Sequence, residues 1–225
     1  MNRDADTSRG VVVFDLDGTL VDTSEDIAFT INHLRQRQGL AALKTDEILK
    51  AVGLGAPFLL RNMLEIDSSK PDITDHWLSA FQTHYMQHQG ERSHLYPGID
   101  AALEALRAFA DLYVLSNKPH DATVQEVNKK GIHHHFESIW GAGQFSALKP
   151  DPAGIHAACK ISDAPHMKAV MIGDLWVDIQ AGLNAGVHTI FVGWGFGSDL
   201  PRAPAPTRAV STPRSIPETV RQLIS

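Results

Sequence analysis

The sequence has little of what several large classes of protein require. Cys159 is the single cysteine in 225 residues, so a disulfide within the chain is excluded and a reducing compartment is favoured. No apolar run approaches the roughly 20 residues of a membrane-spanning helix. Asp and Glu outnumber Lys and Arg by 26 to 20, and the net charge of −6 provides no basic footprint for nucleic acid or an anionic membrane. We therefore expect a cytoplasmic protein without nucleic-acid or membrane partners.

The chain also lacks internal repeats, and residues 1–9 lack the apolar stretch of a signal peptide, so we expect a polar N-terminal tail there. The remaining length suffices for one core domain and a smaller insertion. Five prolines in residues 201–217 predict a surface connection before a last short helix. The sequence leaves open whether the protein is a monomer or a homodimer.

The most informative segment joins an apolar run to two acids. Residues 11–14 are Val-Val-Val-Phe, which is typical of a strand buried on both faces of a parallel sheet. Asp15 and Asp17 follow, and Gly18 then lets the chain turn. In open α/β sheets, ligands bind beyond the carboxyl ends of the strands. Two crowded carboxylates there need a shared proton or a cation, and Mg²⁺ is the simplest such cation.

A second apolar run, at residues 169–173, also ends in an acid, Asp174. Residues 175–186 predict a helix that Gly186 ends. Asp178 falls in the first turn of this helix, where a carboxylate suits the positive end of the helix dipole. The sequence thus places another pair of acids at a strand end.

Groups suited to phosphate follow a third apolar run, at residues 112–115. Ser116 and Asn117 bring a hydroxyl and an amide, both of which donate hydrogen bonds. Lys149 lies in a loop that two nearby prolines stiffen. Residues 193–197 have several glycines but not the spacing of a dinucleotide-binding loop, so we expect a turn beside the site.

Between the first motif and residue 96 the pattern is helical. Polar residues at the start of segments and apolar residues at helical spacing within them predict helices over about 24–38, 46–52, 57–64 and 72–87. From residue 98 onward helices and strands alternate, which predicts a doubly wound parallel sheet of the α/β class, a Rossmann-like core. We expect this core to comprise residues 10–22 and 96–225, with a helical domain of residues 23–95 inserted after the first strand.

Together these segments resemble the four motifs of the haloacid-dehalogenase superfamily, in the right order and over most of the chain. The matching segments are Asp15-Leu16-Asp17-Gly18-Thr19-Leu20-Val21-Asp22-Thr23, Ser116-Asn117-Lys118, Lys149-Pro150 and Gly173-Asp174-Leu175-Trp176-Val177-Asp178. The inserted helices are similar to the cap of the subgroup that includes phosphoglycolate phosphatases. Because both Asp15 and Asp17 are present, the resemblance argues against dehalogenation and against a non-catalytic binding module.

The resemblance implies covalent phosphoryl transfer. Asp15 would attack phosphorus and form an aspartyl-phosphate, while Asp17 would act first as acid and then as base. Ser116 and Lys149 would hold the transferring oxygens.

The resemblance also implies Mg²⁺ as the cofactor, and the predicted metal site comprises Asp15, Asp17, Asp174 and Asp178. Asp17 would contribute its backbone carbonyl, and Asp178 would orient Lys149 or a metal-bound water.

The predicted partner is a small phosphorylated metabolite, and the first candidate is 2-phosphoglycolate. Residues 53–57 resemble the cap loop of phosphoglycolate phosphatases, and Arg61 would pair with a substrate carboxylate. The residues expected to bind substrate are Thr19, Gly53, Gly55, Arg61 and Asn117. A phosphosugar mutase similar to β-phosphoglucomutase, a pyrophosphatase, and another sugar-phosphate or nucleotide phosphatase of the superfamily stay open as alternatives.

Overall fold

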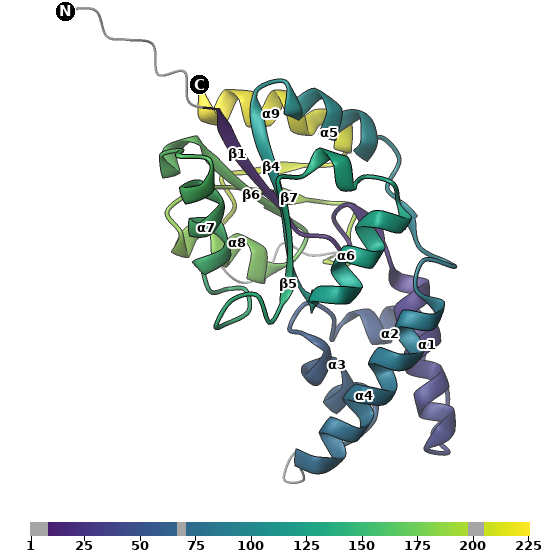
Figure 1. The fold of residues 1–225 in the computed structure, drawn as a ribbon. Coiled ribbons are helices and arrows are strands. Elements are labelled where there is room, and N and C mark those ends of the chain that lie inside the picture. Colours follow the sequence, from purple (N-terminus) through teal and green to yellow (C-terminus); the bar gives the residue numbers. More distant parts are fainter. Residues whose placement is uncertain (1–8, 67–70, 198–204) are drawn as a thin grey trace, which may run out of the picture.

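A parallel sheet forms the centre of the molecule in the computed structural model, which describes residues 9–66, 71–197 and 205–225 (Figure 1). Within these residues, six strands pair in the order β5-β4-β1-β6-β7-β8, and every pairing is parallel. The strands are β1 (Gly10–Phe14), β4 (Ala110–Pro119), β5 (Ser138–Ala142), β6 (Ala169–Gly173), β7 (His188–Val192) and β8 (Arg208–Val210).

The central strand β1 is buried on both faces, which is why its sequence is apolar without alternation. Val12 and Phe14 face one hydrophobic cluster, and Val11 and Val13 face the other. Helices α5 (Ile99–Arg107), α6 (His120–Lys129) and α9 (Ile216–Ile224) contribute to the first cluster, and α7 (Ala153–Ile161) and α8 (Trp176–Asn184) to the second. Helices therefore cover both faces of the sheet (Figure 1), which confirms the predicted doubly wound α/β fold.

The strand order brings three strand ends to one place. β1 lies between β4 and β6, with Phe14 level with Val114 on one side and Ile172 on the other. Chain connections diverge to opposite sides of the sheet at β1, and such a point opens a crevice beyond the carboxyl ends of the strands. Three of the four predicted motifs follow these strands, so the topology gathers them at one edge, and the Lys149 motif follows the neighbouring strand β5.

Four helices, which we call the cap, lie at that edge (Figure 1). They are α1 (Ser24–Arg37), α2 (Thr45–Leu49), α3 (Ala56–Met63) and α4 (Pro71–His88). The cap has its own hydrophobic cluster, to which Ile31, Ile48, Leu60 and Phe81 each contribute from a different helix. We propose that residues 23–95 form a cap domain on a core domain of residues 10–22 and 96–225.

The chain enters and leaves the cap side by side, because β2 (Val21–Asp22) pairs antiparallel with β3 (His94–Leu95). Three short 3₁₀ helices complete the described elements, at His133–His135, His166–Lys168 and Pro213–Ser215. Among the helices that the structure describes, none has the length and apolar character needed to cross a bilayer.

One prediction about the C-terminal part was wrong. Residues 201–217 were expected to be a surface connection, but Arg208–Val210 forms the edge strand β8 along β7; residues 201–204 lie outside the described residues. Three residues between prolines are too few to show strand periodicity, so β8 is defined only by its pairing with β7.

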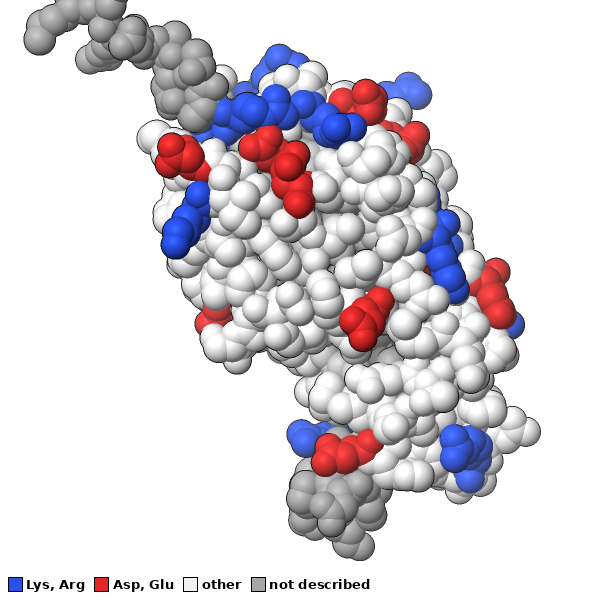
Figure 2. Space-filling view, in the orientation of Figure 1, with Lys and Arg blue, Asp and Glu red and all other residues white. Residues whose placement is uncertain are grey.

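Charged side chains are unevenly distributed on the face of the molecule drawn in Figure 2. On the face in Figure 2, Lys and Arg gather mainly at the end of the core away from the cap, with Asp and Glu beside them, and the middle is largely uncharged. The charges that matter for chemistry are instead buried at the junction of core and cap.

Candidate active site

Asp15 and Asp17 lie at the carboxyl end of β1 and are both buried. The Asp15 backbone N–H donates to the Ile172 carbonyl at 2.9 Å, which continues the sheet one residue past β1. Gly18 follows with φ +84°, and a Cβ at this position would lie 2.4 Å from Asp174 Oδ2. Glycine is therefore needed both for the left-handed turn and for the close approach of Asp174.

Lys149 bridges two of the predicted acids. Its Nζ donates to Asp15 Oδ1 at 2.7 Å and lies 2.8 Å from Asp178 Oδ1. The side chain of Asp178 also accepts the Leu175 backbone N–H at 3.0 Å, so it anchors the start of α8 as well as the lysine. This arrangement places Asp178 where it can orient Lys149, which is one of the two roles predicted for it.

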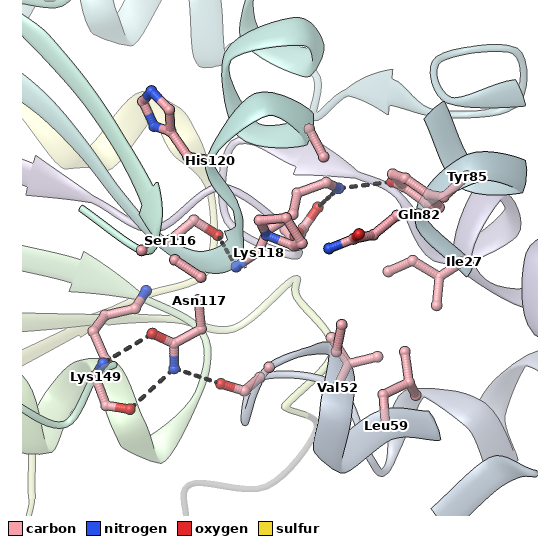
Figure 3. Close-up of a pocket in the computed structure, with 18 of the residues that line it drawn as sticks. Ile27, Val52, Leu59, Gln82, Tyr85, Ser116, Asn117, Lys118, His120 and Lys149 are labelled. Atoms are coloured by element: carbon pink, nitrogen blue, oxygen red, sulfur yellow. Dashed lines mark hydrogen bonds and ion pairs between the residues drawn. The ribbon is translucent and has the colours of Figure 1, made fainter. Parts of the chain in front are cut away.

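Asn117 positions the Lys149 loop. Its Oδ1 accepts the backbone N–H of Lys149 at 2.8 Å, and its Nδ2 donates to the carbonyls of Lys149 at 3.0 Å and Gly53 at 2.8 Å (Figure 3). The sequence predicted that Asn117 would bind substrate, but its amide is used within the protein. It connects the core to the cap loop that contains Gly53.

The side chain of Thr19 is likewise used within the protein. It is fully buried, and its Oγ1 donates to Asp174 Oδ1 at 2.9 Å. The other oxygen, Asp174 Oδ2, accepts the backbone N–H of Phe196 at 2.7 Å, so the glycine-rich turn at residues 193–197 lies beside the site as predicted. Thr19 thus supports a predicted metal ligand and does not reach the space available to substrate.

Asp15, Asp174 and Asp178 form a compact acidic cluster. Each offers a carboxylate oxygen, and these oxygens lie within 4.8 Å of one another in the protein interior. Burial raises the pKa of Asp15 to about 7 even though Lys149 acts in the opposite direction. Burial also raises the pKa of Asp174, and the charges of Asp15 and Asp178 add to the effect. Three oxygen donors with excess negative charge fit a hard divalent cation such as Mg²⁺.

Asp17 points away from that cluster. Its Oδ1 accepts hydrogen bonds from Thr23 Oγ1 at 2.8 Å and from Lys118 Nζ at 2.7 Å, and Lys118 Nζ also donates to the hydroxyl of Tyr85 at 2.7 Å. Burial by itself would lower the pKa of Lys118, but Asp17, Tyr85 and Glu126 together outweigh it, so the pKa is raised and the side chain stays charged. Among the predicted ligands, the Asp17 carboxylate is the one that lies outside the cluster, which leaves its backbone carbonyl as the expected donor.

Sequence reasoning did not assign a function to Lys118 or Tyr85. Lys118 could have been suspected because it lies two residues after Ser116 in the second motif. Tyr85 gave no signal, because an aromatic residue at helical spacing in α4 is indistinguishable from an ordinary core residue.

A pocket of about 440 Å³ lies between the two parts of the chain. Its core wall includes Asp15, Asp17, Ser116, Lys118 and Lys149. Its cap wall is mainly apolar and includes Ile27, Val52 and Leu59 (Figure 3), as well as Phe81 and Met86. A phosphoryl group would therefore meet charged side chains, and the rest of the ligand would meet an apolar surface.

Two of the predicted cap residues line this pocket, and a third does not. Gly53 and Gly55 belong to the lining, whereas Arg61 is exposed on α3 and lies outside it. Leu59 and Leu60 turn inward on α3, and each further residue rotates by about 100° around a helix, so the next position faces solvent. The structure thus does not bring Arg61 to the predicted substrate site.

The sequence model of the haloacid dehalogenase-like hydrolases matches residues 12–192. The chain belongs to this family. It is 32% identical over 197 residues to a plasmid-encoded phosphoglycolate phosphatase of Cupriavidus necator, covering 86% of this chain and 84% of that protein. It is 34% identical over 195 residues to a phosphoglycolate phosphatase of Agrobacterium fabrum, covering 85% and 83%.

A solved structure agrees with this family. The crystal structure of a predicted phosphoglycolate phosphatase from Haemophilus somnus has a TM-score of 0.87 to this chain at 26% identity, covering 96% of this chain and 99% of that one. The similarity extends over the cap as well as the core, so this family member shares the whole architecture.

Proposed function

We propose that this family member is a phosphoric monoester hydrolase that acts on a small phosphorylated metabolite through an aspartyl-phosphate at Asp15. The observation that carries the proposal is the ion pair of Lys149 with Asp15, which both line the pocket, beside two more buried acids. The curated relatives named above are phosphatases, which supports the same reaction.

Asp15 is suited to act as the nucleophile. Within the described residues, the hydrogen bond to its side chain goes to Oδ1, which leaves Oδ2 for the phosphorus atom. In the first step Oδ2 bonds to phosphorus and the ester P–O bond breaks, while Asp17 gives a proton to the departing oxygen. In the second step Asp17 takes a proton from water as that water attacks phosphorus, and the bond to Asp15 breaks to release inorganic phosphate.

Lys149 and Ser116 would bind the transferring phosphoryl oxygens, since both line the core wall of the pocket. Mg²⁺ would be held by the carboxylates of Asp15, Asp174 and Asp178 and the backbone carbonyl of Asp17. It would supply positive charge that lets an anionic ester approach buried carboxylates.

The first candidate substrate is 2-phosphoglycolate, because relatives at above 30% identity carry that name. The Gly53–Gly55 loop lets backbone approach a small ligand closely, and both glycines line the pocket. With a single cysteine in the chain, we place the reaction in the cytoplasm.

A phosphate-release screen with Mg²⁺ tests the proposal. The panel contains 2-phosphoglycolate, sugar phosphates, nucleoside monophosphates, pyrophosphate and 4-nitrophenyl phosphate. Asp15→Asn should abolish release, because the amide is near-isosteric with the carboxylate but is not a nucleophile. Asp111→Asn, at the opposite end of the sheet, is the matched control and should stay active. Failure of the wild type on every ester, or an active Asp15→Asn protein, would contradict the proposal.

A further inference from the structure

The pocket contains a buried lysine that the proposed chemistry does not use. Lys118 lies at the end of β4, and its side chain is only 6% exposed. Its ammonium group donates at 2.7 Å to Asp17 Oδ1 and at 2.7 Å to the hydroxyl of Tyr85, and it lies 4.6 Å from the centre of the Tyr85 ring (Figure 3). A charge this deep inside a protein is retained only where its partners are well placed.

These contacts fix the orientation of the Asp17 carboxylate. Lys118 and Thr23 both donate to Oδ1, and among the described residues no side-chain or backbone donor is directed at Oδ2. Asp17 lines the pocket, so Oδ2 is the oxygen left for the ester. Proton transfer requires the acid to lie within hydrogen-bond reach of the departing oxygen, and a misplacement of about 1 Å can cost roughly a hundredfold in rate.

Tyr85 links this arrangement to the cap. It belongs to α4, is buried, and stacks on Phe81 at 5.4 Å between ring centres, so its hydroxyl is held firmly by the cap. Lys118 belongs to the core. The bond between them therefore forms only when the cap lies against the core.

On this basis, and on the proposed phosphatase function, we propose that Lys118 is a positioning residue that orients the Asp17 carboxylate toward the departing oxygen. Tyr85 makes this orientation depend on cap closure. The ammonium group takes no part in bond making; it acts through Asp17. Protonation would be efficient only in the closed state, in which bulk water is excluded.

The dependence of rate on the leaving group separates this role from a structural one. An alkyl phosphate needs a proton on its departing oxygen, whereas a nitrophenyl phosphate departs with little help. Lys118→Met keeps the length of the side chain and removes its charge. We expect kcat to fall roughly tenfold to a hundredfold on ethyl phosphate and 2-phosphoglycolate alike, but less than about threefold on 4-nitrophenyl phosphate.

Lys130→Met is the matched control. Lys130 also joins the core to the segment that leaves the cap, with its Nζ donating to the Ser93 carbonyl at 2.6 Å, but Asp17 is not among its contacts. In this variant, the ratio of kcat on the alkyl phosphates to kcat on 4-nitrophenyl phosphate should be the same as in the wild type.

A second variant tests the cap dependence with little risk to folding. Tyr85→Phe keeps the stacked ring and removes only the hydroxyl. We expect a loss of about threefold to tenfold on the alkyl phosphates, in the same direction as Lys118→Met and again small on the aryl phosphate. Wild-type rates in Tyr85→Phe would overturn the part of the proposal that concerns the cap.

The other outcomes are equally distinct. Equal losses of Lys118→Met on all three esters would show a structural role, and a loss confined to 2-phosphoglycolate would show that Lys118 binds the substrate carboxylate; either result overturns the proposal. If the wild type releases no phosphate from any ester, the proposed function itself fails. If the wild type is active and the ratio of rates is unchanged in Lys118→Met, only the positioning role fails.

Discussion

Lys149 Nζ lies 2.7 Å from Asp15 Oδ1, although 134 positions separate the two residues in the sequence. The same ammonium group reaches Asp178, so one lysine counterbalances two buried carboxylates of a cluster of three. This imbalance makes the site dependent on positive charge.

Lys149→Met should lower the free energy of unfolding by about 3–5 kcal/mol at pH 8 without metal, because it leaves buried carboxylates without their partner. Added Mg²⁺ should restore part of this loss by binding the same carboxylates. Urea denaturation with and without Mg²⁺ measures both effects. Lys160→Met, an exposed lysine at the end of α7, is the control and should change little.

Hydrolysis should stop in excess chelator and return with Mg²⁺, whereas Ca²⁺ should support it poorly. Ca²⁺ takes more ligands at longer distances and would disturb the geometry of attack on phosphorus. Phosphate release after chelation and stepwise metal addition measures this. Undiminished release in chelator would rule out metal assistance.

Gly18→Ala should remove activity, because the new methyl group would lie 2.4 Å from Asp174 Oδ2 and displace that carboxylate. Gly39→Ala separates this clash from backbone strain, since Gly39 also has a positive φ, +74°, but a methyl group there would meet no neighbouring atom of the described residues within 4 Å. Both variants should lose about 1–2 kcal/mol of stability through strain. Only Gly18→Ala should lose turnover, as compared by denaturation and phosphate release.

Arg61→Ala should leave the turnover of 2-phosphoglycolate and of 4-nitrophenyl phosphate unchanged within about twofold, because an exposed side chain outside the pocket contributes little. Steady-state kinetics on both esters checks this. A selective loss on 2-phosphoglycolate would mean that α3 turns to bring Arg61 into the pocket when substrate binds.

His84 should make the stability of the cap sensitive to acid. Burial, together with the nearby His33, lowers the pKa of His84 from 6.5 to about 4. Between these two values the unfolded chain binds more protons than the folded one, so stability rises with pH there. The stabilisation present above pH 6.5 is lost as the pH falls towards 4.

His84→Gln should flatten this part of the stability profile, measured by urea denaturation at several pH values. His134→Gln changes an exposed histidine outside the cap and should leave the slope unchanged. An unaltered slope in His84→Gln would contradict the assignment of this pH dependence to His84.

Most of the fold followed from local patterns. The apolar run at residues 11–14, the two acids after it and the turn at Gly18 depend only on neighbours in the chain, and these features predicted the central strand and the edge at which the site lies. The short strand β8 could not be found in this way, because its three residues carry no periodicity and gain their hydrogen bonds only from β7.

The candidate site also contains features that the sequence predicted and features that it could not predict. The sequence by itself determined which residues are the candidates for nucleophile, acid and metal ligands, because those residues follow strands whose ends must meet in a doubly wound sheet. It could not determine where single side chains point: Arg61 turns outward because of the rotation of α3, and the amide of Asn117 is taken up by backbone groups.

Only the tertiary structure joined Asp17, Lys118 and Tyr85. Lys118 is 101 positions from Asp17 and 33 from Tyr85, and no local pattern relates them. Their contacts depend on how the cap packs against the core, which brings Ala122 of α6 into the hydrophobic cluster of the cap and is not set by any residue's immediate neighbours. The sequence therefore determined the candidate reacting groups, and the packing of two parts of the chain decided how their side chains are oriented.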